Sequence, residues 1–271
     1  MLGFILINWR NETMKRRDFI KSVATIAALA PIAGHKAIAD LTHNSNTTER
    51  NNKMKKVIIL NASPRTNFNT AKMLKEAQKG AESVGAEVEY FDLVKLNYKG
   101  CMSCFACKIK NSKTNGLCAI RDDLRPILEK ILQADAVIIG SPVYFSQATG
   151  MFRNLMERML FAPLRYMKSE RTNLTRKIPL GLIYTMNCPE KMAKQINYDM
   201  ILGTDEKACK MIFGYSEVLN SYDTYQFTDY SKYDCDMFDE AHKKEMLEKQ
   251  FPKDLEKAFD LGKRLTELKL N

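Results

Sequence analysis

The first side chains suited to chemistry follow an unbroken apolar run at residues 57–60 of this 271-residue sequence. Residues 61–65, Asn-Ala-Ser-Pro-Arg, form a turn-rich loop, and a helical pattern begins shortly after it. Because the order is strand, loop and helix, free backbone N–H groups and the positive end of the helix dipole face the loop. Ser63 and Thr70 add hydroxyl groups and Arg65 adds a cation, so we expect a phosphate site. Neither a Walker loop nor the three-glycine dinucleotide fingerprint is present, which argues against ATP and a Rossmann-type NAD site.

A second loop with useful chemistry follows another continuous apolar run, at residues 136–140. Its sequence, Ser141-Pro142-Val143-Tyr144-Phe145, joins a proline-stiffened backbone to aromatic rings and peptide groups. A flat heteroaromatic ring with polar edges would suit such a loop.

Four cysteines lie close together in the sequence, with the spacing C-x-x-C-x-x-C and a fourth cysteine after ten residues. They are Cys101, Cys104, Cys107 and Cys118. Four thiolates this close can converge on one iron-sulfur cluster or one zinc ion. Disulfides or free thiols are the remaining alternatives. Cys188, Cys209 and Cys235 show no paired spacing, and we interpret them as core or surface thiols.

Strand and helix patterns alternate along the chain from residue 55. We expect strands at 57–60, 87–93, 136–140, 178–184 and near 217–222, and helices at 69–84, after a cap at Asp122, after a loop at 141–147, from about Glu190 and at the C-terminal end. This alternation predicts an α/β fold with a doubly wound, five-stranded parallel sheet and helices on both faces. In such sheets, ligands bind outside the carboxyl ends of the strands near the switch in strand order, which is where both loops would lie.

The two loops resemble those of the NADPH-dependent FMN reductase family of flavodoxin-like proteins, over about residues 55–161. The resemblance implies a flavodoxin-like fold, FMN as cofactor, NAD(P)H as a possible donor, and no catalytic side chain because FMN carries the chemistry. It implies that Ser63, Arg65, Asn67, Asn69 and Thr70 bind the FMN phosphate, and that Pro142, Val143, Tyr144 and Phe145 contact its ring. Phe68 departs from the family pattern, in which a small residue precedes the Asn-Thr pair. Residues 185–187 are a weaker candidate for a third loop at the ring edge.

The cysteines resemble the compact motif of iron-sulfur flavoproteins, which carry a four-iron cluster beside FMN. The gap before Cys118 is longer than that motif usually has. A 4Fe-4S cluster, zinc, disulfides and free thiols all stay open here.

The N-terminal region differs in character from the rest. Residues 1–39 contain a basic segment with paired arginines, a short apolar segment and small residues, which resembles a twin-arginine signal peptide. Met14 is a plausible true start, and residues 40–54 form a polar linker. We therefore expect a flavodoxin-like domain at 55–271 with a cysteine-rich insertion at 97–119. We expect it to be exported and periplasmic or extracytoplasmic, or cytoplasmic if the signal is not used.

Composition excludes several classes. The formal charge is +10, and without residues 1–39 about +6 would remain, scattered rather than clustered with aromatics, so nucleic acid is not suggested. The apolar segment is too short for a stable membrane span. Of the three histidines, two lie before residue 44, and His242 alone cannot build a Ser-His-Asp or zinc-hydrolase site, so hydrolysis is disfavoured.

These features favour an exported FMN-dependent oxidoreductase. It would pass electrons from a reduced donor, NAD(P)H or a redox partner, to a small acceptor such as a quinone or flavin, with or without an iron-sulfur cluster. We expect a small-molecule or protein redox partner and a homo-oligomer. The alternatives are a noncatalytic flavodoxin-like electron carrier and a cysteine-based redox- or metal-sensing protein.

Overall fold

The computed structural model of the protein describes residues 54–114 and 116–270. The predicted signal peptide and all of the predicted linker except Met54 lie outside the described residues. Within them, no helix has the length and apolar content that a transmembrane span requires.

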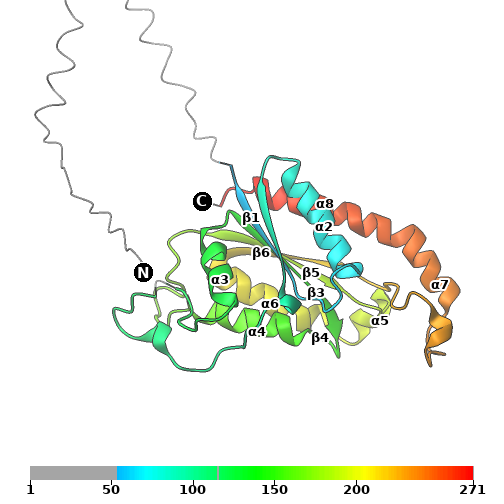
Figure 1. Cartoon of the computed structure of the whole chain (residues 1–271), viewed down its shortest axis with the longest axis horizontal. Helices are drawn as coiled ribbons and strands as arrows, with labels where there is room; N and C mark the ends of the chain where they lie inside the picture. The colour runs from blue at the N-terminus through cyan, green and yellow to red at the C-terminus, as the bar shows by residue number, and fades with distance from the viewer. Residues whose placement is uncertain (1–53, 115, 271) are drawn as a thin grey trace, which may run out of the picture. The chain divides into compact units, whose positions relative to one another are not determined.

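Five parallel strands form the sheet, and a short sixth strand, β4, pairs antiparallel with β3 (Figure 1). The strands are β1 (Lys56–Asn61), β2 (Glu87–Asp92), β3 (Ala136–Tyr144), β4 (Gln147–Ala148), β5 (Ile178–Thr185) and β6 (Gly214–Ser221). The order of the five parallel strands is β2-β1-β3-β5-β6. This is the flavodoxin-like arrangement, in which the strand order reverses between β1 and β3. The predicted fold class is confirmed.

Helices cover both faces of this sheet. They are α2 (Asn69–Glu82), α3 (Leu124–Gln133), α4 (Gly150–Phe161), α5 (Glu190–Gln195), α6 (Tyr198–Phe213), α7 (Glu240–Glu245) and α8 (Phe251–Glu267), with a π-helical turn at Met246–Gln250. Alternate side chains of β1 explain why it is apolar throughout. Val57 and Ile59 pack with the apolar residues of α2 and α8, whereas Ile58 and Leu60 pack with those of α3, α4 and α6.

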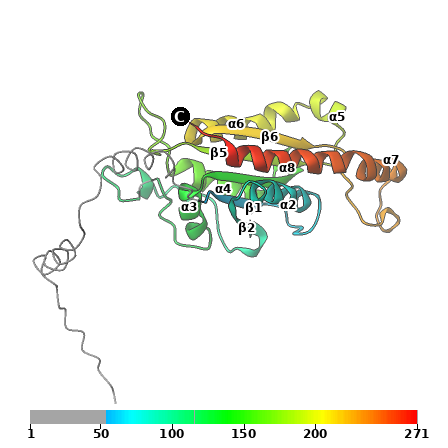
Figure 2. The same cartoon turned by 90° about the horizontal axis from the view of Figure 1, so that it is seen from above.

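Helices α2 and α8 lie side by side on one face, and two glycines allow their close approach (Figure 2). A Cβ atom on Gly80 would lie 1.9 Å from the carbonyl oxygen of Phe259, and one on Gly262 would lie 1.9 Å from that of Ala77. Both contacts are with backbone, which cannot move aside as a flexible side chain can. The two helices therefore require glycine at both positions.

The predicted loop at 141–147 is wrong in part. β3 continues to Tyr144, and Val143 and Tyr144 pair with Ala148 and Gln147 in a hairpin. The turn of this hairpin consists of Phe145 and Ser146, which have φ values of 49° and 68°. Positive φ at both central residues matches the right-handed twist of the flanking strands, so a two-residue turn closes the hairpin without glycine.

Other boundaries also differ from the prediction. Asp122 accepts a hydrogen bond from the N–H of Leu124 at 3.2 Å, but Asp123 is the residue at the cap position of α3. The helix expected from Glu190 is two helices, because Asn197, which lies between them, has a φ of 62° that a continuous helix does not allow. β6 begins at Gly214 rather than near residue 217, directly after α6 ends at a glycine with a φ of 91°.

The close crossing of α2 and α8 gives a stability prediction. Gly80→Ala should lower the free energy of unfolding by about 3 kcal/mol, because the new methyl group would overlap the Phe259 carbonyl. Gly203→Ala in α6 is the control, since a Cβ there meets nothing within 4 Å; it should raise stability by about 0.5–1 kcal/mol. Urea denaturation of both variants measures the difference, and equal stabilities would contradict the crossing described here.

Candidate functional site

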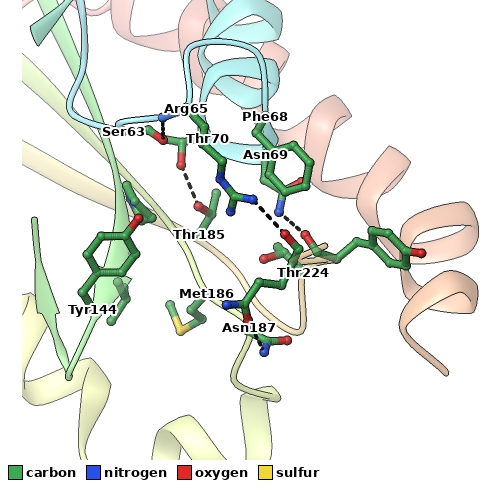
Figure 3. Close-up of a pocket in the computed structure, with 14 residues that line it drawn as sticks. Ser63, Arg65, Phe68, Asn69, Thr70, Tyr144, Thr185, Met186, Asn187 and Thr224 are labelled. Atoms are coloured by element: carbon green, nitrogen blue, oxygen red, sulfur yellow. Dashed lines mark hydrogen bonds between the residues drawn. The ribbon is translucent and has the colours of Figure 1, made fainter. Parts of the chain in front are cut away.

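A pocket lies at the carboxyl edge of the sheet, where β1, β3 and β5 end (Figure 3). Four chain segments line it: the loop and helix start after β1, the end of β3, the end of β5, and the segment after β6. The lining residues are Ser63, Arg65, Phe68, Asn69, Thr70, Pro142, Val143, Tyr144, Thr185, Met186, Asn187, Thr224, Tyr225 and Gln226.

Short-range hydrogen bonds fix the loop after β1. The side-chain oxygen of Asn61 accepts from the N–H of Ser63 at 3.0 Å, and the hydroxyl of Ser63 accepts from the N–H of Arg65 at 3.1 Å. The amide of Asn61 also donates to Asp92 at the end of β2, at 2.9 Å. Consecutive turns of this kind are the reason that Asn and Ser occupy these positions. The loop is thus shaped before any ligand arrives.

Helix α2 begins in the pocket with free binding capacity at its N-terminus. Phe68 occupies the cap position and supplies no side-chain hydrogen bond, and the first turn contains no acidic residue. Uncapped N–H groups at a helix start favour an anion. Asn69 and Thr70 are both buried there, and the Thr70 hydroxyl lies 2.7 Å from that of Thr185 in β5.

Arg65 is the charged side chain among the described residues that line the pocket. Its guanidinium carbon lies 3.8 Å from the centre of the Phe68 ring, and its Nη1 donates to the carbonyl oxygen of Gln226 at 2.7 Å. A guanidinium carries five N–H groups, so this bond leaves donors available for an anion. Phe68, the departure from the family pattern, therefore supports the arginine in this structure.

The opposite side of the pocket is formed by the β3–β4 hairpin. Pro142 and Val143 are half-buried, and Tyr144 is 48% exposed at the mouth. This side presents apolar and aromatic surface, in contrast to the polar side formed by the first loop. The two sides together suit a ligand with an anionic end and a flat end.

The end of β5 supplies a polar group without a partner. The side-chain oxygen of Asn187 is buried and accepts no hydrogen bond from the described residues, whereas its amide donates to the side chain of Gln226 at 2.7 Å. A buried acceptor left unpaired costs free energy. A ligand N–H in the pocket would satisfy it.

Thr149 joins the two sides of the pocket. Its hydroxyl donates to the carbonyl oxygen of Ala62 at 2.8 Å, and its N–H donates to the hydroxyl of Ser141 at 3.0 Å. The same hydroxyl caps α4 by accepting from the N–H of Phe152. Because Thr149 is buried, these bonds are shielded from water and fix the distance between the loops.

The pocket brings most of the predicted ligand-binding residues together. It contains Ser63, Arg65, Asn69 and Thr70 of the predicted phosphate group and Pro142, Val143 and Tyr144 of the predicted ring group. Asn67 is exposed and does not line it, and Phe145 is fully exposed at the hairpin turn. Sequence reasoning missed Phe68 and residues 224–226. These last three follow a strand whose carboxyl end lies at the same sheet edge, and that topology is the signal that could have found them.

The four predicted metal ligands lie in the segment between β2 and α3. Cys118 is buried, Cys101 and Cys107 are half-buried and Cys104 is exposed. Within residues 54–114 and 116–270, no three cysteine, histidine or carboxylate side chains gather closely enough to hold a metal ion. No cysteine of the described chain is in a disulfide.

Two cations hold this segment against α4. Lys108 is oriented by carbonyl oxygens at the end of α4 and just beyond it, donating to those of Ala162 and Leu164 at 3.2 and 2.6 Å. Burial lowers its pKa. Arg158 is fully buried and donates to Asp122 at 2.5 Å; burial disfavours its charge, but the neighbouring Asp122 and Cys118 raise its pKa overall. Burial also raises the pKa of Cys107, and the nearby Cys118 and Cys101 add to that increase.

Most of the pocket lining comes from a segment whose sequence matches a known family. Residues 55–187 match the sequence model of the family described as NADPH-dependent FMN reductase. That segment contributes every lining residue of the pocket except Thr224, Tyr225 and Gln226.

Several curated relatives are similar over part of the chain. An iron-sulfur flavoprotein of Methanocaldococcus jannaschii is 37% identical over 110 residues, which cover 41% of this chain and 53% of that protein. An iron-sulfur flavoprotein of Archaeoglobus fulgidus is 39% identical over 109 residues, covering 40% and 46% respectively. The chain spans about half the length of these curated relatives.

Solved structures share the fold. A NAD(P)H:quinone oxidoreductase from Methanothermobacter marburgensis superimposes with a TM-score of 0.57 over 80% of this chain and 100% of that one, at 14% identity. An azoreductase from Bacillus anthracis gives 0.54 over 78% and 100%, also at 14% identity. At this identity the likeness shows the fold alone. The match to the family model thus covers residues 55–187, and the solved structures share the fold over about four fifths of the chain.

Proposed function

We propose that the protein is an FMN-dependent oxidoreductase that transfers electrons from a reduced donor to a small acceptor. The observation that carries the proposal is that two groups of residues line one pocket. On one side lie Ser63, Arg65, Asn69 and Thr70, and on the other lie the hairpin residues Pro142, Val143 and Tyr144. One side suits a phosphate and the other a flat ring. The family match over residues 55–187 supports FMN as the ligand and NADPH as a donor.

The chain's own groups fit this cofactor. The uncapped start of α2 and the Arg65 guanidinium would hold the phosphate, since both attract an anion. Tyr144 and Met186 would bound the ring, and the unpaired oxygen of Asn187 would accept a hydrogen bond from a ring N–H. FMN, when bound, supplies the electron chemistry. The protein's part is to bind the cofactor, orient it and limit its contact with water.

The proposal also names the electron acceptor and an alternative to NADPH as the electron donor. We propose a small, flat acceptor such as a quinone or a flavin, because Tyr144 leaves about half of its surface at the pocket mouth for such a molecule. A protein redox partner is the alternative donor.

An iron-sulfur cluster on Cys101, Cys104, Cys107 and Cys118 is a separate part of the proposal. The cysteine spacing and the names of the similar flavoproteins support it. Among the described residues no three of these cysteines gather closely enough to hold a metal ion, so binding a cluster would require the cysteine-rich segment to rearrange. We therefore assign no electron-transfer step to it.

Flavin binding tests the main proposal. The protein should bind one FMN per chain, with loss of flavin fluorescence, and should then oxidise NADPH in the presence of a quinone. Arg65→Met should weaken FMN binding roughly 10- to 100-fold, because it removes a charge-assisted hydrogen bond worth about 1.5–3 kcal/mol. Its effect on riboflavin, which lacks the phosphate, should be small.

Lys72→Met is the matched control for Arg65→Met. Lys72 lies in the first turn of α2, is exposed and does not line the pocket, and its ammonium lies 5.9 Å from the centre of the Phe68 ring. Its loss therefore removes the same charge and leaves the pocket lining in place. FMN affinity should change less than about twofold. A wild-type protein that binds neither FMN nor riboflavin would refute the proposal, and binding without NADPH turnover would favour an electron carrier.

Iron analysis tests the cluster. Protein purified without oxygen should contain about four iron and four sulfide per chain beside the flavin. Cys118→Ser should lower both, whereas Cys235→Ser, outside the cysteine-rich segment, should leave them unchanged. Flavin-loaded wild-type protein that takes up no iron after reconstitution would rule the cluster out.

A further inference from the structure

A buried lysine contacts two of the segments that form the pocket. Lys243, in the short helix α7, is 2% exposed, although lysine is among the residues least often buried. Its ammonium group donates to the carbonyl oxygen of Asn187 at 2.7 Å and pairs with the carboxylate of Asp223. It therefore ties together two segments that line the pocket, the end of β5 and the segment after β6.

Asp223 completes this tie. It is 5% exposed, and its second carboxylate oxygen lies 2.7 Å from Nε2 of His242. Its backbone donates to the carbonyl oxygen of Cys188 at 3.0 Å and adopts a φ of 55°. That conformation is unfavourable for most residues but accessible to aspartate, so the carboxylate is aimed at Lys243 by an unusual backbone turn.

The next three residues connect Asp223 to the predicted phosphate site. Thr224 donates its N–H to the carbonyl oxygen of Met186 at 2.9 Å. The carbonyl oxygens of Tyr225 and Gln226 then accept hydrogen bonds, both of 2.7 Å, from the side chains of Asn69 and Arg65 (Figure 3). These carbonyls hold the two side chains in one orientation at the edge of the pocket.

We propose that Asp223 and Lys243 are positioning residues for phosphate recognition. By fixing the start of segment 224–226, they fix the two carbonyls that orient Arg65 and Asn69. This inference rests on the proposed FMN site. It adds to that site the pocket-lining segment 224–226, which lies outside the matched residues 55–187. Loss of the Asp223–Lys243 pair should therefore weaken binding of the FMN phosphate more than binding of the ring.

The comparison of FMN with riboflavin isolates this effect. The two ligands share the ring and differ in the phosphate. The dissociation constant of riboflavin divided by that of FMN, here called the ratio, therefore reports phosphate recognition. General loosening of the fold would weaken both ligands and leave the ratio nearly unchanged. A loss of orientation at Arg65 and Asn69 would lower the ratio.

The test variant is Asp223→Asn combined with Lys243→Met. Removing one partner of a buried pair would leave an unpaired charge, whereas removing both avoids that cost. Asparagine also tolerates the φ of 55°, and methionine keeps the unbranched shape of the lysine stem. We expect the preference for FMN over riboflavin to fall at least about fivefold, in line with the partial loss of one charge-assisted hydrogen bond.

Lys244→Met is the matched control, because Lys244 is the exposed neighbour of Lys243 on the same helix. It should keep the wild-type ratio. An unchanged ratio in the folded double variant would overturn the inference while leaving the proposed function intact, whereas a wild-type protein that binds no FMN would overturn both. If the double variant does not fold, Asp223→Gly with Lys243→Met replaces it, since glycine adopts this φ without strain, and the same ratio decides.

Discussion

The burial of β1 between β2 and β3, with helices on both faces, decides where this chain can meet a ligand. From Val57 to Leu60 every side chain of the strand is in the core, and the first polar side chain after them is Asn61 at the carboxyl end. Parallel pairing puts the ends of β3 and β5 at that same edge. The polar groups of three separate loops are therefore brought together by the packing of apolar residues far from them.

Hydrogen bonds between loops then set the shape of the pocket. Thr149 binds the carbonyl of Ala62 from the β3 side, and Thr70 meets Thr185 across the helix–sheet boundary. These groups are buried, so each bond forms away from competing water and would be costly to leave unmade. A pocket built in this way is largely formed before the ligand binds, which reduces the ordering that binding requires.

Much of this arrangement is readable from the sequence, and the reasons are local. The apolar runs at 57–60 and 136–140 predict buried parallel strands, and the polar residues that follow them predict a site at the strand ends. Phe145 shows the limit of such reasoning. It is adjacent to Tyr144, yet the two-residue turn with positive φ directs it into solvent, and nothing in the composition of 141–147 announces that turn. Side-chain direction there depends on pairing with β4, a tertiary property.

The topology could have placed the segment after β6 at this edge of the sheet, but its contacts could not be predicted, for a different reason. Its contacts with Arg65 and Asn69 are made by carbonyl oxygens of Tyr225 and Gln226, and every residue type carries a carbonyl, so no motif marks the position. What fixes those carbonyls is a charge pair between residues twenty apart, Asp223 and Lys243, in a chain with many acidic and basic residues. Only the fold identifies this pair, because both of its side chains are buried, whereas most other ion pairs of the described residues have at least one exposed partner. A site can thus owe its side chains to one part of the sequence and their orientation to another.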